Sequence, residues 1–212
     1  MTPAYDKELM LSAKENFAVM MDYAVCWCGM DLRGFYSRFL ESGVDKAMEC
    51  GHPKYLVGMS GIELARMVVE DTGGHLPLDE NYAFPWEDSS VYWTGWAICQ
   101  YQWYKAAGFA SIDRNGLPIE QVYSLFHPFH EADITKVFAV FDTYYRPRAL
   151  PFKELRKNAG LTQAELSQRS DVSLRMIRAY EQGSQDISRA EAATLLRLSR
   201  ALHCPIDRLL GK

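Results

Sequence analysis

The sequence predicts an all-α protein, in which an N-terminal helical domain is joined by a proline-containing linker to a smaller C-terminal domain of five helices. Three observations favour this architecture. Apolar residues recur at helical spacing along most of the chain. Ser/Thr-x-x-Glu capping boxes, which satisfy the free amides of a helix start, precede several of these segments. Paired prolines then interrupt the pattern, so we expect domains at residues 1–146 and 147–212.

Two amphipathic helices are predicted at the start of the first domain. Charged and apolar residues alternate at helical spacing from Asp6 to about Cys28. A second such stretch covers residues 31–42. Its apolar side consists of Leu32, Phe35, Tyr36, Phe39 and Leu40. Each stretch therefore has one face suited to a core.

A loop and a third helix are expected next. Residues 43–59 are interpreted as a loop, because Gly-His-Pro at 51–53 and Gly-Met at 58–59 interrupt the pattern. The sequence Ser-Gly-Ile-Glu at 60–63 is a capping box. The helix that it opens is expected to end at Thr-Gly-Gly, residues 72–74.

The rest of the first domain is predicted to surround one aromatic helix. Residues 75–90 are interpreted as an extended connection because of their prolines. Residues 91–107 are aromatic almost all the way round, so this helix should lie centrally in the domain. Two further helices are expected at residues 118–126 and 131–144, and residues 145–151 form the linker. The second of these helices has spaced apolar residues at Ile134, Val137, Phe138 and Phe141.

The C-terminal domain contains two short helices separated by a tight turn. A capping box at residues 162–165 starts one helix at Gln163, and this helix stops at the turn 171–172. Ser173 caps the next helix, and Gly183 ends it as a C-cap glycine. Two helices joined so closely cannot bury both their faces against each other, so they need further helices to close a core.

Those further helices flank the pair. A short apolar-patterned helix is expected to end at Leu155. A capping box at residues 188–191 is expected to open a fourth helix, which Pro205 ends before a last turn at 206–210. The apolar side of the fourth helix consists of Ala192, Leu195, Leu196, Leu198 and Leu202. Within the helix that Ser173 caps, Ile177 and Tyr180 lie three residues apart and face this core.

In this register, residues 150–210 resemble the Xre/Cro/lambdoid-repressor helix-turn-helix family. The matching residues are Leu155, Arg156, Leu161, Thr162, Gln163, Leu166, Val172, Ser173, Ile177, Tyr180, Glu181 and Gly183. The resemblance implies a lambda-repressor-like fold and a sequence-specific DNA-binding regulator, expected to be a repressor. It also implies that Gln163 touches a phosphate and braces the reading helix, and that Arg156 and Glu181 form a structural ion pair. The residues that it places at the major groove are Ser173, Leu174, Arg175, Arg178 and Ala179.

The side chains on this reading face indicate what each could recognise. Arg175 has the planar donor fork that suits O6 and N7 of guanine. Leu174 offers only an apolar surface, which suits a thymine methyl, and Arg178 could reach a base or a phosphate. Two features depart from the family pattern. The first reading position is Leu174, where the family often has a polar residue, and the loop 184–187 lacks the basic residues that are common there. We therefore expect modest affinity for the DNA backbone.

Charge is distributed unevenly along the chain. Residues 151–212 hold eleven Lys and Arg against seven Asp and Glu, a net charge of +4, which leaves −8 for residues 1–150. A basic module attached to an acidic one fits a regulator whose attraction to DNA is confined to one end. The acidic balance could equally serve only to keep a large helical domain in solution.

Composition limits the other classes of protein to which the chain could belong. With 48% hydrophobic residues in 212, the chain can bury a substantial core. No apolar run is long enough to span a bilayer, and the first residues lack the basic start of a secretory signal, so we expect a cytoplasmic protein without a membrane partner. The five cysteines are odd in number and lie mostly in apolar stretches, which favours buried thiols over disulfides.

Two clusters in the sequence are candidates for metal sites. One is the stretch His-Pro-Phe-His-Glu-Ala-Asp at 127–133, and the other combines Cys26 and Cys28 with Cys50 and His52. Neither has the paired two-residue spacing typical of zinc ligands, and the polar residues at 130–133 fit better as caps of a helix start. With no nucleophile or phosphate-binding signature either, we expect no metal, no cofactor, no catalytic residue and no enzymatic activity.

The first domain is expected to bind a partner. Its segments at 51–69 and 92–104 are similar to those of proteins described as antitoxins or autoregulators, found beside helix-turn-helix modules in bacterial operons. This similarity implies a cognate toxin protein bound by residues 1–146. The alternative is a free-standing transcription factor whose first domain binds a small-molecule effector in an aromatic-lined pocket. Either protein is expected to bind its double-stranded operator as a homodimer, because one module contacts few base pairs. The operator sequence, the partner and the dimer interface stay open.

Overall fold

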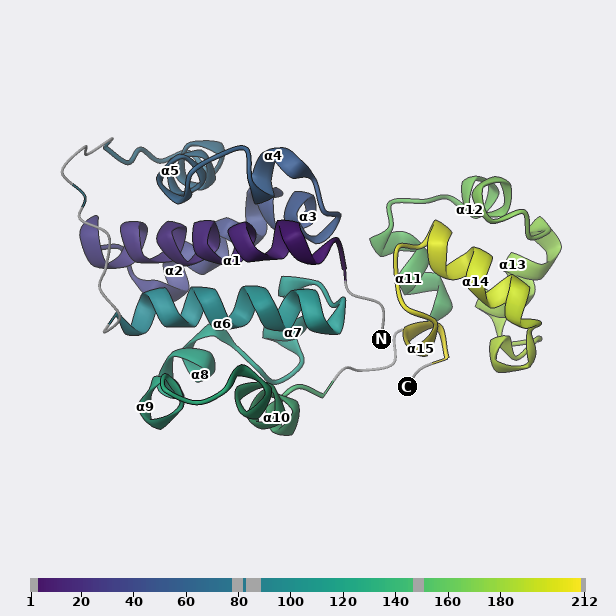
Figure 1. Cartoon of the computed structure of the whole chain (residues 1–212). Helices are drawn as coiled ribbons and strands as arrows, with labels where there is room; N and C mark the ends of the chain where they lie inside the picture. The colour runs from purple at the N-terminus through teal and green to yellow at the C-terminus, as the bar shows by residue number, and fades with distance from the viewer. Residues whose placement is uncertain (1–3, 78–81, 83–88, 147–150, 211–212) are drawn as a thin grey trace. The chain divides into compact units, whose positions relative to one another are not determined.

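The structure is a computed structural model that describes residues 4–77, 82, 89–146 and 151–210. Contacts divide the chain into two compact units, Met1–Pro147 and Arg148–Lys212 (Figure 1). The described residues form helices and connecting turns, with no strand among them. The predicted all-α class is therefore confirmed. None of the helices in these ranges combines the length and apolar character that crossing a bilayer requires.

The first unit is a cluster of helices with a single apolar core. Its elements are α1 (Lys7–Asp22), the π-helical turn η1 (Tyr23–Trp27), α2 (Leu32–Glu41), α3 (Val44–Glu49), α4 (Pro53–Leu56), α5 (Gly61–Asp71), α6 (Ser90–Lys105), α7 (Phe109–Arg114), α8 (Ile119–Ser124), α9 (Phe126–Phe129) and α10 (Ile134–Tyr144). The helices predicted around residues 6–28, 31–42, 60–71, 91–107 and 131–144 are all present.

The long helices α1 and α6 form the centre of this unit and run side by side (Figure 1). Ten residues of α6 are buried, so the prediction of a central aromatic helix is confirmed. Gly95 of α6 lies against the backbone of α1. A Cβ atom added there would lie 2.9 Å from Cα of Ala18 and 3.1 Å from Cγ of Met21. The absence of a side chain at position 95 therefore sets the spacing between the two helices.

The segment 43–59 is not a loop, as the sequence suggested, but holds the short helices α3 and α4. Val44, Met48 and Leu56 are buried by at least 98% and attach both helices to the core. Pro53 occupies the first turn of α4, where its fixed φ and missing N–H are tolerated. Helices this short depend on tertiary burial rather than on their own periodicity, so the pattern alone did not indicate them. The same holds for α7, which was not predicted.

The predicted helix starts agree with the observed caps in most cases. Ser60 and Glu63 form the full capping box of α5. At α10 only Asp133 acts as a cap, accepting from the Thr135 amide at 2.8 Å, so the assignment of His130 and Glu131 as caps is wrong. His130 instead contacts the Phe126 carbonyl through Nδ1 at 3.1 Å.

The two predicted connections lie partly outside the described residues. Residues 78–81 and 83–88 of the extended connection and 147–150 of the linker are not described. Before the linker the chain is held in place, because the Arg146 amide donates to the Asn115 carbonyl at 2.7 Å and Tyr145 is buried. Pro151 then precedes the first helix of the second unit.

The second unit has five α-helices, as predicted, and a core of its own. Its elements are α11 (Phe152–Asn158), α12 (Gln163–Ser170), α13 (Leu174–Gln182), the 3-10 turn η2 (Ile187–Arg189), α14 (Ala192–Ala201) and α15 (Ile206–Leu209). The buried core residues are Phe152, Leu155, Leu161, Leu166, Val172, Ile177, Leu198, Ala201, Leu202 and Leu209. The predicted caps Thr162 and Ser173 and the C-cap Gly183 are all confirmed.

The predicted capping box at residues 188–191 is wrong. Ser188 lies inside η2, and α14 begins only at Ala192 after Glu191. The carboxylate of Asp186 accepts from the Ser188 amide at 2.9 Å and starts the 3-10 turn instead. Asp186 therefore caps the turn that contains Ser188, and α14 begins without a side-chain cap.

The expectation of buried thiols holds only in part. Cys99 is fully buried, and burial raises the pKa of its thiol to about 12. Cys26 and Cys50 are exposed, Cys28 and Cys204 are half-buried, and none of the five cysteines forms a disulfide.

We expect Gly95→Ala to destabilise the first unit by about 1–3 kcal/mol, because the added methyl overpacks the contact between α1 and α6. All five tryptophans lie between residues 27 and 103, so unfolding followed by tryptophan fluorescence reports on this unit.

Gly34→Ala in α2 is the matched control. Its added Cβ would meet only Asp31, at 3.4 Å, and alanine is the better helix former by about 1 kcal/mol. Equal midpoints for Gly95→Ala and the unchanged protein would show that the close approach is not a constraint.

Candidate nucleic-acid interface

The candidate interface is the outward face of α13, which the sequence assigned to DNA reading. Ser173, Arg175 and Arg178 are exposed, and Leu174 and Ala179 are half-buried. On the opposite face, Ile177 is fully buried, and Tyr180 packs edge-on against Phe152 with ring centroids 5.8 Å apart. The helix therefore presents the predicted residues to the exterior and attaches to the core through its other side.

The turn between α12 and α13 is fixed by local contacts. Asp171 adopts the left-handed conformation with φ of 50°, and its neighbour Val172 is buried. The Ser167 hydroxyl donates to the Val172 carbonyl at 2.7 Å. Ser173 then accepts from the Met176 amide at 3.3 Å and caps α13. These contacts set the direction in which α13 leaves the turn.

A buried ion pair joins the last turn of α13 to α11. Arg156 Nε donates to Oε1 of Glu181 at 2.5 Å, and Arg156 Nη2 donates to Oε2 at 3.2 Å. The two side chains are 11% and 4% exposed. The hydrogen bond from Arg156, helped by one from Gln163, lowers the pKa of Glu181. A carboxylate shielded and neutralised in this way adds little repulsion toward a phosphate backbone.

Gln163 contributes to the same network from the start of α12. Its Nε2 donates to Oε2 of Glu181 at 2.7 Å, and Arg156 Nη1 also donates to the Leu161 carbonyl at 2.6 Å. The side chain of Gln163 is half-buried. Gln163 therefore contacts α13, the helix that carries the reading face.

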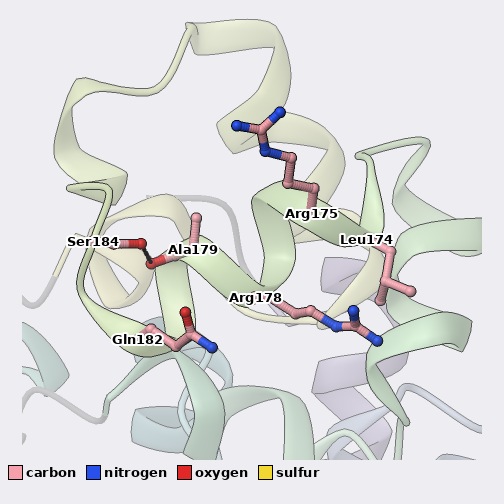
Figure 2. A pocket seen from close by; sticks show the side chains of 6 residues that line it. All are labelled: Leu174, Arg175, Arg178, Ala179, Gln182 and Ser184. Carbon is pink, nitrogen blue, oxygen red and sulfur yellow. Dashed lines mark hydrogen bonds between the residues drawn. The ribbon is translucent and has the colours of Figure 1, made fainter.

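The reading face has a shallow hollow, which Figure 2 shows from close by. Its lining residues are Leu174, Arg175, Arg178, Ala179, Gln182 and Ser184. Gln182 and Ser184 were not among the predicted site residues. Gln182 continues the spacing of Arg175 and Arg178 by one more turn, which could have indicated it. Ser184 lies beyond the helix, and its hydroxyl donates to the Ala179 carbonyl at 3.2 Å.

The two arginines on this face have free guanidinium groups. Within the described ranges neither Arg175 nor Arg178 takes part in an ion pair. Other cations of the unit do have acidic neighbours. Examples are Arg197 with Asp171 at 3.2 Å, Lys157 with Glu154 at 3.4 Å and Arg189 with Asp186 at 3.9 Å. The guanidinium groups of both arginines of the hollow therefore form no ion pair with the described residues.

Comparison with known families agrees with this geometry. Residues 152–209 match the family model described as Helix-turn-helix. This segment is a helix-turn-helix domain of the Xre/lambda-repressor type. No curated protein and no solved structure is similar enough to the chain to give a match.

Within the helix-turn-helix domain, α12, its turn and α13 form the motif itself. In this motif the second helix enters the major groove, and here that helix is α13. The match identifies the chain as a DNA-binding transcription regulator. It covers the second unit only, and the role of the first unit does not follow from it.

The two clusters weighed as metal sites lie in the first unit. His127 and His130 have ring centroids 5.0 Å apart, and His130 stacks on Phe126 at 4.5 Å. In the parts of the chain that the structure describes, no three His, Cys, Asp or Glu side chains are arranged to hold a metal ion. The contacts of His130 with Phe126 are those of an aromatic cluster.

We expect Glu181→Gln to destabilise the helix-turn-helix domain by about 3–5 kcal/mol, because it leaves the buried Arg156 charge without a counter-ion. Thermal unfolding followed by far-ultraviolet circular dichroism measures this loss. Tryptophan fluorescence, which reports only on the first unit, should not change.

Glu154→Gln is the control for this experiment, since Glu154 pairs with Lys157 at 3.4 Å on the surface. An exposed pair of this kind contributes about 0–1 kcal/mol. Similar losses for Glu181→Gln and Glu154→Gln would contradict the structural role of the buried pair.

Proposed function

We propose that the chain is a sequence-specific repressor that reads an operator through the outward face of α13. The observation that carries this proposal is the pair of exposed guanidinium groups of Arg175 and Arg178, which form no ion pair with the described residues, on a helix held by a buried ion pair. Free guanidinium forks suit guanine edges in the major groove. Rigid placement keeps them in register with the base pairs.

The other predicted contacts extend this interface. Gln163 at the start of α12 is proposed to donate to a phosphate of the DNA backbone, fixing the position of the domain. Ser173 and Ala179 lie on the same outward face as the arginines and are proposed to contact the groove. Phosphate contacts position the protein, whereas the base contacts of α13 give it specificity.

We further propose that the regulator binds as a homodimer. A single helix-turn-helix domain contacts few base pairs, and paired half-sites about one DNA turn apart multiply its specificity.

The first unit is proposed to bind a cognate toxin, so that the chain acts as antitoxin and autoregulator. Its surface supports binding to a protein, because several large apolar side chains are at least 37% exposed. These are Leu11, Trp27, Val57, Tyr104, Tyr123 and Tyr144. The net charge of −8 over residues 1–150 favours a basic partner.

One observation favours the alternative, a small-molecule effector. Asp22 is 3% exposed, accepts from the Tyr82 hydroxyl at 2.9 Å and is also bonded by Ser89. Both donors are neutral, and no cation is paired with Asp22 among the described residues. Since Tyr82 also meets Trp27 edge-on at 5.7 Å, an effector with a positively charged group would suit this corner.

The reading face is tested by two substitutions. Arg175→Ala should relax the preference at one base position by about 1–3 kcal/mol, whereas Gln163→Ala should weaken binding to all sequences to a similar extent. Affinities for a selected operator and its single-base variants measure both effects. Arg200→Ala, an exposed arginine on α14, is the control. If Arg175→Ala and Gln163→Ala both bind like the unchanged protein, the assigned face is wrong.

The role of the first unit is tested by co-purification. The full chain, expressed from its native operon, should retain the product of a neighbouring gene, and its co-expression should relieve the toxicity of that product. A thermal-shift screen with metabolites distinguishes the alternative, because an effector that binds the folded state raises the melting temperature. Absence of both a retained protein and a relieved toxicity would exclude the antitoxin role.

A further inference from the structure

Leu174 and Arg178 lie one helical turn apart on α13, and both line the hollow of the reading face. Figure 2 shows that the side chain of Arg178 extends toward Leu174, whereas Arg175 extends away from it. Side chains four residues apart on a helix are neighbours, with Cβ atoms about 5–6 Å from each other. Arg178 and Leu174 are therefore neighbouring positions on the outward face of α13.

The chemistry of the two side chains is complementary. The guanidinium of Arg178 is exposed, has no ion-pair partner in the described residues, and can donate two parallel hydrogen bonds. Guanine is the base whose major-groove edge offers two acceptors to such a fork. Leu174 has no donor or acceptor, and the methyl of thymine is the apolar group that a base pair presents in this groove.

Two side chains that are neighbours on α13 are expected to contact neighbouring bases. In a DNA strand the C5 edge of a pyrimidine lies next to the N7 edge of the purine that follows it. A thymine methyl that precedes guanine is therefore in contact with whatever binds that guanine. An arginine bound to the guanine can pack one face of its guanidinium against the thymine methyl. A leucine next to that arginine can then contact the same methyl from its opposite side.

We infer that Leu174 and Arg178 act together to read a thymine followed by guanine on one strand, with Arg178 on the guanine and Leu174 on the thymine methyl. This inference rests on the proposed function and specifies the base step that α13 recognises. Cytosine methylated at C5 carries its methyl at the same place, so a methylated cytosine-guanine step is the second substrate of the same pair.

The test uses the full chain and DNA that differs by one methyl group. Operators are first selected from random duplexes, and the thymine of each selected thymine-guanine step is replaced by deoxyuridine, which lacks only the methyl. Binding of the unchanged protein should weaken about fourfold, the effect of losing one buried methyl contact. For Leu174→Ala the two duplexes should bind within about twofold of each other.

A second substitution in the DNA tests whether adding a methyl group, rather than removing one, changes the affinity. The thymine-adenine pair of the step is replaced by cytosine-guanine, with and without a methyl at C5 of the cytosine. The methylated duplex should bind the unchanged protein about fourfold more tightly than the unmethylated one. Leu196→Ala, which truncates a leucine 43% exposed on α14, is the matched control and should keep both effects.

The outcomes separate this inference from the proposed function. Selection that enriches no sequence would overturn both, because the chain would then not read DNA. Enriched operators without a thymine-guanine step, or operators in which removal of the methyl leaves the affinity unchanged, would overturn only the pairing of Leu174 with Arg178. Equal sensitivity to the methyl in Leu174→Ala and the unchanged protein would assign the contact to another side chain.

Discussion

The ion pair between Arg156 and Glu181 is the interaction on which the placement of the reading helix depends. α13 buries only Ile177 completely, so its apolar attachment to the core is narrow. Glu181 accepts from Arg156 of α11 and from Gln163 of α12, and thereby ties three helices at one carboxylate. A narrow apolar contact fixes the distance of a helix from the core, and directional hydrogen bonds fix its rotation. Rotation decides which side chains enter a groove.

A charged pair at this place also removes an electrostatic conflict. Glu181 lies on the helix that is proposed to face the DNA, where an exposed carboxylate would oppose phosphates. Burial of an ion pair costs desolvation energy, and this cost is offset only when the remaining donors are satisfied. Here Arg156 also donates to the Leu161 carbonyl, and the second oxygen of Glu181 is bonded by Gln163. The network thus holds the helix without placing a net negative charge at the interface.

Sequence and structure agree where local chemistry and core packing indicate the same boundary. The capping boxes at Ser60 and Thr162 are followed by helices with buried apolar faces, and both were predicted. The capping box predicted at Ser188 is absent because the carboxylate of Asp186 caps a 3-10 turn that contains Ser188. The spacing of Ser188 and Glu191 alone does not show that Asp186 competes for the same segment. The helices α3 and α4 escaped prediction because burial of residues such as Met48 and Leu56 forms them. The same limit applies to the site, since Ser184 joins the hollow through the fold of the chain after α13.

The distribution of charge sets what each unit can contribute to DNA binding. Exposed pairs such as Arg197 with Asp171 can exchange their partner for a phosphate, but each exchange leaves a carboxylate close to the DNA. The backbone attraction therefore follows the net charge of +4 on residues 151–212 more than the number of arginines. A module with so small an excess gains affinity chiefly by being doubled, because a second half-site adds its binding energy to the first. The first unit, at −8 for residues 1–150, does not supply that attraction, which agrees with the proposal that it acts by binding a protein or a ligand.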